Sequence, residues 1–163
     1  NIIEMLHAGS RDIGFAGEDW VRELDADVVE LLDTGLDPVK LIAAAPKPLL
    51  VDGKLPAQQL TIASEYELIT KRWIDREKLN AVFIRSYGAT EVFPPEDADC
   101  IVDNSATGET LRANNLEIVA ELMTSSTRLY ASPEAVSYTH LRAHETVLDL
   151  VCRLLLEKKN STK

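Results

Sequence analysis

Residues 101–115 read IVDNSATGETLRANN, and this stretch decides how the rest of the chain is interpreted. The apolar pair Ile101 and Val102 predicts the end of a β-strand, and the helix-forming residues from Glu109 to Leu116 predict a helix. Between them lies a loop of small and polar residues: Asp103, Asn104, Ser105, Ala106, Thr107 and Gly108. A strand that leads into the first turn of a helix favours anion binding. The free N–H groups there point outward, and glycine lets a phosphate approach the backbone.

The loop offers two kinds of ligand. The hydroxyl groups of Ser105, Thr107 and Thr110 can donate hydrogen bonds to a phosphate. The carboxylate of Asp103 is unsuited to a phosphate, but it suits a sugar hydroxyl or a Mg²⁺ ion. The loop therefore predicts a site for a phosphorylated sugar. The same pattern is also typical of an ordinary helix after a strand, with Thr107 as its N-cap, and both interpretations stay open on the local pattern.

The bulk composition excludes several classes of protein. The chain has 163 residues and a formal net charge of −10, which allows one domain or two small lobes and argues against a nucleic-acid-binding surface. No apolar run reaches the length of a membrane span, and no signal peptide is visible, so we expect a cytoplasmic protein. Cys100 and Cys152 lie in apolar runs without metal-ligand spacing and are expected to be buried thiols in a reducing compartment.

The order of expected elements indicates an α/β fold with largely parallel sheets. Two uniformly apolar strands are expected at 26–32 and 39–45, separated by a turn at 33–35. Prolines and a glycine then break the pattern near residue 47, where we expect a lobe boundary. Further strands are expected at 60–63, 81–86, 99–102, 117–123 and 128–132, with a helix at 65–76.

The loop sequence resembles a signature of the ATP phosphoribosyltransferase family, which catalyses the first step of histidine biosynthesis. Residues 103–116, DNSATGETLRANNL, are similar to its pattern D-L-V-S-T-G-x-T-L-x-x-N-x-L, with departures at Asn104, Ser105 and Ala106. Four other segments resemble family motifs in the same order: GFAGEDW with ELLDTGL, TIASEY, SYGATEVFP and TRLYAS. Glu67, directly after TIASEY, stands where the corresponding family motif usually has proline. Several motifs in order are stronger evidence than one.

The resemblance implies a two-lobed fold like that of type II periplasmic binding proteins, with the first lobe incomplete. Residues 1–46 and 126–136 would belong to the first lobe, and residues 47–125 would form the second lobe with the phosphoribosyl-pyrophosphate loop. The chain begins at Asn1 in what reads as a helix end, so we expect that an N-terminal portion is missing. This chain alone is therefore expected to be inactive.

The resemblance also implies a reaction, in which N1 of ATP attacks phosphoribosyl pyrophosphate and pyrophosphate leaves with the help of Mg²⁺. The expected partners are thus ATP and phosphoribosyl pyrophosphate, in a homo-oligomer with or without a separate regulatory subunit. No catalytic residue is assigned. The residues expected to bind phosphoribosyl pyrophosphate are Asp103, Ser105, Ala106, Thr107, Gly108, Glu109 and Thr110. Asp103 is also the candidate Mg²⁺ ligand, and the candidates for nucleotide or ribose contact are Glu91, Gly17 and Asp19.

Each of these last candidates also has a purely structural interpretation. Glu91 is equally well explained as an exposed loop residue, and Gly17 and Asp19 as the start of a helix. Arg112 is expected to be a solvated helix residue. Two rival functions remain, a non-catalytic solute-binding module of the same fold and an inactive fragment.

Residues 137–163 form a tail with more basic than acidic residues and no counterpart in the family pattern. We expect this tail to be non-native. His140 and His144 are spaced to share a helix face, but without a third ligand they do not predict a metal site.

Overall fold

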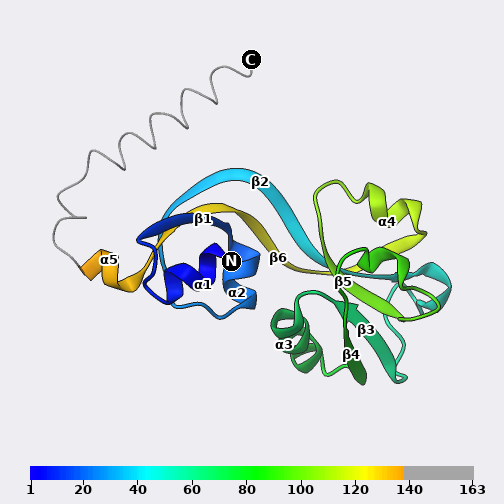
Figure 1. Ribbon diagram of the computed structural model, residues 1–163. Coiled ribbons are helices and arrows are strands. Elements are labelled where there is room, and N and C mark those ends of the chain that lie inside the picture. The colour runs from blue at the N-terminus through cyan, green and yellow to red at the C-terminus, as the bar shows by residue number, and fades with distance from the viewer. Residues whose placement is uncertain (138–163) are drawn as a thin grey trace, which may run out of the picture. The chain divides into compact units, whose positions relative to one another are not determined.

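The computed structural model describes residues 1–137. The tail that the sequence sets apart, with His140, His144 and Cys152, lies outside the described residues except for Ser137. Within the described part the chain divides into two compact units (Figure 1). Unit 1 contains Asn1–Gly17, Ala26–Leu36 and the chain from Thr127, and unit 2 contains Glu18–Asp25 and Asp37–Ser126. None of the helices between residues 1 and 137 has the length and hydropathy that a membrane span requires.

The strands of unit 1 are antiparallel where their register is established. Strand β1 (Ile13–Gly17) pairs with the end of β6 (Leu116–Ala131), so that Ile13 lies opposite Ala131. Helix α1 (Ile2–His7) contacts β1 and buries Ile3 and Leu6, and α5 (Pro133–Ser137) follows β6. A Cβ atom added to Gly14 would lie 2.6 Å from Cγ1 of Ile2, so the contact between α1 and β1 requires glycine at this position.

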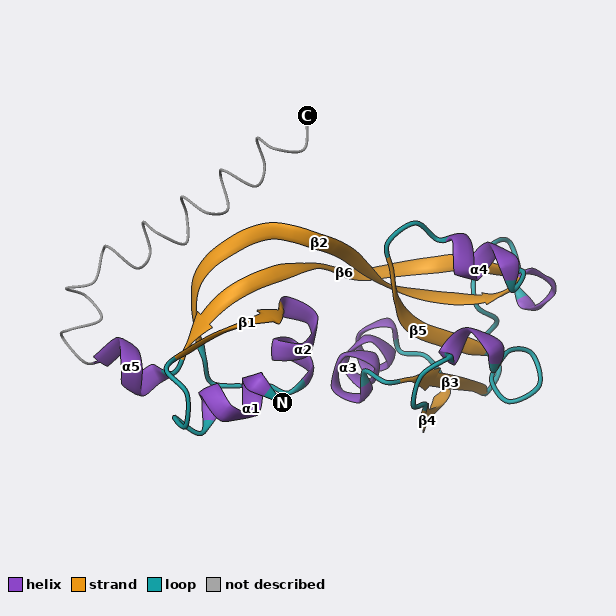
Figure 2. Cartoon of the chain, turned by 45° about the horizontal axis from the view of Figure 1, so that its top comes forward, coloured by secondary structure: helices purple, strands orange, loops and turns teal. Residues whose placement is uncertain are grey.

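Unit 2 is built on three parallel strands with one antiparallel neighbour (Figure 2). The central strand β3 (Leu60–Ser64) pairs in parallel with β4 (Ala81–Arg85) and with β5 (Cys100–Ser105), and β5 pairs antiparallel with β2 (Val29–Pro46). The helices of unit 2 are α2 (Glu18–Glu23), α3 (Glu67–Glu77) and α4 (Glu109–Ala113), and short 3₁₀ turns lie at Lys47–Leu49 and Thr90–Val92.

Apolar residues on the two faces of β5 enter separate cores, as the alternation of strand side chains requires. Cys100 and Val102 pack with Tyr66 and Trp73 in one core, which α3 covers. Ile101 packs in the other core with Leu111 of α4 and residues of neighbouring strands. Tyr66, at the N-cap of α3, and Trp73 within the helix thus pack inward, as their helical spacing predicts.

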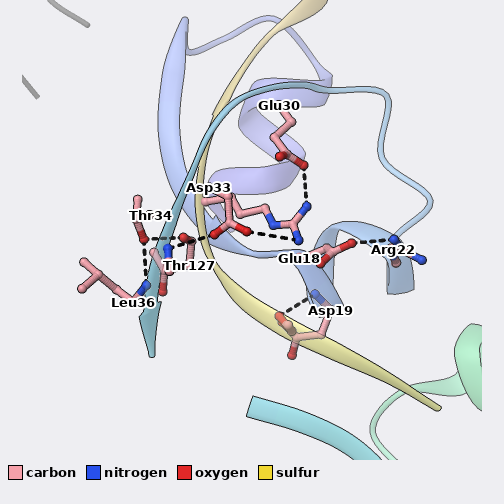
Figure 3. Close-up of polar contacts among 11 residues, drawn as sticks. Glu18, Asp19, Arg22, Glu30, Asp33, Thr34, Leu36 and Thr127 are labelled. Atoms are coloured by element: carbon pink, nitrogen blue, oxygen red, sulfur yellow. Dashed lines mark hydrogen bonds and ion pairs between the residues drawn. The ribbon is translucent and has the colours of Figure 1, made fainter. Parts of the chain in front are cut away.

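The turn expected at 33–35 is wrong. Strand β2 runs without interruption for 18 residues and passes from unit 1 into unit 2 at Leu36. Gly35 and Asp37 have positive φ angles of 63° and 48°, so the turn-forming residues change the path of the strand without ending it. The Thr34 hydroxyl donates to the Thr127 carbonyl, which ties β2 to β6 at this point (Figure 3).

Two further expectations differ from the structure. The strands expected at 117–123 and 128–132 are one continuous strand, β6. The sheet is also mixed and not largely parallel, because β1 pairs antiparallel with β6 and β2 pairs antiparallel with β5. The division between the units falls at 36/37 and 126/127, whereas the sequence suggested 46/47 and 125/126. Helix α2 also belongs to unit 2, although the segments on both sides of it belong to unit 1.

Helix α2 is held in unit 2 by both polar and aromatic contacts. The Trp20 ring packs on the Tyr66 ring with a centroid distance of 4.7 Å. The buried carboxylate of Glu23 accepts hydrogen bonds from the backbone N–H groups of Leu68 and Ile69 in the first turn of α3. Because Tyr66 provides no side-chain cap for α3, Glu23 supplies from another helix the acceptor that an N-cap residue normally provides.

Candidate functional site

The loop after β5 is shorter than the sequence suggested. Strand β5 extends to Ser105, so Asp103 and Asn104 lie in the strand, and only Ala106–Gly108 separate it from α4. Helix α4 contains five residues, and Gly108 occupies its N-cap position with φ +73°. Thr107 is therefore not the N-cap residue, and its hydroxyl makes only a long hydrogen bond of 3.4 Å with the N–H of Glu109. One helical turn has little macrodipole, so any anion binding must depend on individual donors.

Two hydroxyl groups shape the loop and remain available as donors. The Ser105 hydroxyl accepts a hydrogen bond from the Gly108 N–H at 2.9 Å, and the Thr107 hydroxyl accepts from the Glu109 N–H. A hydroxyl that accepts with a lone pair still carries its own proton. Ser105 and Thr107 can therefore hold the loop in shape and donate to an oxyanion at the same time.

Arg112 returns from α4 to the loop. Its guanidinium Nη2 donates to the Thr107 carbonyl oxygen at 2.7 Å, although the residue is exposed. From the sequence, Arg112 was expected to be a solvated helix residue outside the site. Its position one helical turn after Gly108 was a usable signal, because helical side chains lean toward the N-terminus of their helix. The structure thus adds a cation to a loop that otherwise offers only neutral donors.

Two pockets flank the loop and share Ser105–Gly108. The strand-end pocket, of about 320 Å³, is lined by Glu91, Asp103–Gly108, Thr110 and Leu111. The α4 pocket, of about 460 Å³, is lined by the shared loop together with Lys40, Ile42, Leu111, Arg112, Leu116, Glu117 and Ile118. The strand-end pocket combines hydroxyl donors with two carboxylates, those of Asp103 and Glu91, whereas the α4 pocket combines them with one carboxylate, Glu117, and the cations of Lys40 and Arg112.

The carboxylates of the strand-end pocket influence each other. The pKa of Asp103 is raised to about 6, chiefly by burial and in smaller part by the negative charges of Glu91 and Glu65, against the lowering effect of the Asn104 N–H. That N–H donates to Oδ1 of Asp103 at 2.7 Å. A carboxyl group that resists ionisation in this way gains most from a neutral hydroxyl donor or a nearby cation.

Most of the expected site residues come together in the structure. Asp103, Ser105, Ala106, Thr107, Gly108 and Thr110 line the strand-end pocket with Glu91, which is held by the 3₁₀ turn Thr90–Val92. Glu109 is not among the residues that line either pocket. Two separate motifs of the family resemblance thus contribute residues to one pocket.

Gly17 and Asp19 line neither of these two pockets. Gly17 ends β1 opposite Thr127. Asp19 is 5% exposed, and its carboxylate accepts hydrogen bonds of 2.7 Å from the Tyr66 and Ser125 hydroxyls. The Tyr66 oxygen in turn accepts from Nδ2 of Asn104 at 3.0 Å. Sequence reasoning missed this network, because its members come from four separate elements.

The comparison with known protein families shows to which family the chain belongs. The model of the ATP phosphoribosyltransferase (HisG) family matches residues 1–158. This chain belongs to the ATP phosphoribosyltransferase family. The match continues past residue 137, so it does not support the expectation that the tail lies outside the family.

Curated relatives carry the same family name. The chain is 40% identical over 137 residues to the ATP phosphoribosyltransferase of Chlorobium phaeobacteroides, covering 79% of this chain and 47% of that protein. It is 41% identical, with the same coverage, to the enzyme of Prosthecochloris aestuarii. The chain thus spans about half the length of the curated relatives it matches.

Solved structures confirm the expected type of fold. The ATP phosphoribosyltransferase of the HisG:HisZ complex from Thermotoga maritima superposes with a TM-score of 0.79 at 26% identity, over 96% of this chain and 74% of that one. The alkanesulfonate-binding protein SsuA of Xanthomonas axonopodis gives a TM-score of 0.56 at 14% identity, over 94% and 57%. The arginine-binding protein of Thermotoga maritima gives a TM-score of 0.55 at 15% identity, over 97% of this chain and 68% of that one. The family member described here therefore has the fold of the periplasmic-binding-protein type.

The residues of this ATP phosphoribosyltransferase family member fit Mg²⁺ only as a metal shared with a ligand. Within residues 1–137, His, Cys, Asp and Glu side chains do not gather in groups of three or more that could bind a metal ion. Asp103 and Glu91 nevertheless offer carboxylate oxygens in one pocket. Mg²⁺ commonly binds through one or two carboxylates together with substrate phosphates and water. Such an ion would lower the pKa of Asp103 by its charge.

Proposed function

We propose that this chain provides the phosphoribosyl-pyrophosphate site of an ATP phosphoribosyltransferase. In the proposed reaction N1 of the ATP adenine forms a bond to C1 of the phosphoribosyl group, and the bond from C1 to the pyrophosphate oxygen breaks. The products are phosphoribosyl-ATP and pyrophosphate, as in the first step of histidine biosynthesis.

One observation carries the proposal: a single pocket combines the hydroxyl-lined loop with Asp103 in a chain of this family. The hydroxyls of Ser105, Thr107 and Thr110 can donate to the 5′-phosphate, and Gly108 lets the phosphate approach the backbone. Asp103 can accept from ribose hydroxyls or share a Mg²⁺ ion with the pyrophosphate. The 5′-phosphate and the ribose hydroxyls thus each have hydrogen-bond partners in this pocket.

Positioning and charge stabilisation are the tasks of the residues in this site. The reaction needs no covalent nucleophile, and the strand-end pocket contains no histidine, lysine or cysteine. Two reactants that both carry several negative charges must be held in line, which can contribute several kcal/mol through orientation alone. Mg²⁺ supplies the charge that makes pyrophosphate a better leaving group.

The wider assembly forms part of the same proposal. The solved relative from Thermotoga maritima is a HisG:HisZ complex, which supports a partner subunit of the HisZ kind for this chain as well. We also propose that the chain forms a homo-oligomer and works in the cytoplasm, where ATP and phosphoribosyl pyrophosphate are made.

The test has a binding part and a turnover part. Calorimetry with residues 1–163 and phosphoribosyl pyrophosphate plus Mg²⁺ should show binding, and ribose 5-phosphate should bind more weakly because it lacks the pyrophosphate. The protein encoded by the whole gene, alone and with a HisZ-type subunit, should form phosphoribosyl-ATP and pyrophosphate from ATP. Absence of both products under every combination would overturn the proposed reaction.

A further inference from the structure

We propose that Asn104 is a second hydroxyl-binding residue of the strand-end pocket, and that Tyr66 and Asp19 are positioning residues that determine which polar atom Asn104 offers. The ligand class is a phosphorylated pentose with free ring hydroxyls. This inference rests on the proposed function, because it specifies how the same pocket recognises the sugar.

Asp103 and Asn104 approach the pocket from different sides of one strand. Consecutive side chains of a strand point to opposite faces, and Val102 and Asn104 share the face on which Tyr66 packs. Ile101 and Asp103 share the other face, toward α4. Both Asp103 and Asn104 line the strand-end pocket at the end of β5. Two acceptors arranged in this way would contact different hydroxyl groups of one sugar.

The direction of the hydrogen bonds follows from the proton of Tyr66. Its hydroxyl donates to Oδ2 of Asp19, while the Ser125 hydroxyl donates to Oδ1 and also accepts from the Asp19 N–H at 3.1 Å. A tyrosine has one hydroxyl proton, so the Tyr66 oxygen can only accept from Asn104. Burial of the Tyr66 ring raises the pKa of its hydroxyl, and the network therefore keeps its proton.

Asn104 is consequently held with its amide nitrogen toward Tyr66. The side chain is exposed, and no hydrogen bond within residues 1–137 reaches its Oδ1 atom. The acceptor left for a ligand is this carbonyl oxygen, which accepts from a hydroxyl and repels a phosphate, while one N–H of the amide is committed to Tyr66. Removing Tyr66 or Asp19 would let the amide turn and offer its N–H₂ group, which would weaken the discrimination for a hydroxyl.

The experiment compares three sugars and inorganic phosphate on residues 1–163. Calorimetry would give the affinities for ribose 5-phosphate, 2-deoxyribose 5-phosphate and 3-deoxyribose 5-phosphate. We expect the parent chain to bind ribose 5-phosphate roughly three- to tenfold more tightly than at least one deoxy sugar, the range of one neutral hydrogen bond. Asn104→Leu and Tyr66→Phe should both reduce this ratio without weakening the binding of inorganic phosphate, because neither change removes a donor to the phosphate.

The matched control is Asn80→Leu, which makes the same substitution at an exposed asparagine outside both pockets. It should leave every affinity unchanged. Because Asn104 is exposed, Asn104→Leu should fold, and the test does not depend on the Tyr66 variant.

The possible failures are distinguishable. If the parent binds ribose 5-phosphate but the ratio stays the same in Asn104→Leu and Tyr66→Phe, the inference is wrong and the proposed function stands. A parent chain that binds all three sugars equally also overturns the inference. A parent chain that binds neither ribose 5-phosphate nor phosphoribosyl pyrophosphate contradicts the proposed function as well.

Discussion

The carboxylate of Glu23 accepts a hydrogen bond from the backbone N–H of Leu68 at 3.0 Å, 45 residues later in the chain. A second bond of 3.1 Å comes from the N–H of Ile69. Glu23→Ala leaves both N–H groups without this acceptor, and we expect the free energy of unfolding to fall by about 1–2 kcal/mol. Urea denaturation would measure it. Glu4→Ala, at an exposed glutamate, is the control and should change the free energy of unfolding little. An equal loss of stability in the two variants would contradict the role of Glu23 as a cap for α3.

Asp103 should make stability depend on pH. Its pKa is about 6 in the folded protein and about 3.9 in an unfolded chain. Between these values the folded state binds more protons, so this group makes the free energy of unfolding fall as pH rises, until the effect levels off above about pH 6. Asp103→Asn should therefore be more stable than the parent at pH 8 and equally stable near pH 4, as thermal melts would show.

A second variant separates the two causes of that behaviour. Glu91→Gln removes one of the negative charges that raise the pKa of Asp103, but it leaves the burial of Asp103 in place. In Glu91→Gln the pKa of Asp103 should be lower than in the parent but still raised by burial, so the free energy of unfolding should fall over a narrower pH range. An Asp103→Asn variant that is no more stable than the parent at pH 8 would show that Asp103 ionises without cost.

Gly108→Ala should weaken sugar-phosphate binding beyond its effect on stability. The φ angle of +73° costs an alanine about 1 kcal/mol, and its methyl group would lie 3.5 Å from the Arg112 guanidinium, next to the loop. Gly53 has the same φ with nothing within 4 Å, so Gly53→Ala is a matched control for strain. We expect similar losses of stability, but roughly tenfold weaker ribose 5-phosphate binding only for Gly108→Ala, by calorimetry. Equal affinities in the two variants would show that the loop does not bind the phosphate.

Gly14→Ala should destabilise unit 1. The new methyl group would lie 2.6 Å from Cγ1 of Ile2, close to the helix backbone, so α1 has to shift away from β1. We expect a loss of about 1–3 kcal/mol in chemical denaturation. Adding Ile2→Ala should recover part of that loss, because it removes the atoms involved. If the double variant shows the sum of the two single losses, steric conflict is not the cause.

The strand–loop–helix at the site was predictable from the sequence because all of its signals are local. Ile101 and Val102 are fully buried in β5, although the strand continues past them to Ser105, and the glycine at position 108 has the backbone conformation that favours glycine. The length of α4 was not predictable to the residue, since helix propensity continues to Leu116 while Asn115 takes a positive φ of 57°.

The errors at β2 and β6 have one physical cause. Residues 33–35 carry ordinary turn signals, but the pairing of β2 with β6 keeps both strands extended past them. Such long-range pairing leaves no mark in a short window of sequence. The same applies to Asp19, whose sequence position suggested a helix start or a cleft, and whose partners Tyr66 and Ser125 lie far along the chain.

The assignment of α2 to unit 2 has a consequence for the order in which the protein is made. Asp19 and Ser125 are separated by 106 residues, yet they share two hydrogen bonds. During synthesis α2 emerges early. The hydrogen bond from the Leu68 N–H to Glu23 can form only after Leu68 has been made, and the bond from Ser125 to Asp19 only after Ser125 has been made. Unit 2 can therefore complete its polar network only after nearly the whole described chain has left the ribosome, and contacts of such high sequence separation slow folding. Until then Glu23 and Asp19 remain hydrated, and the six residues of α2 lack the contacts that stabilise them as a helix.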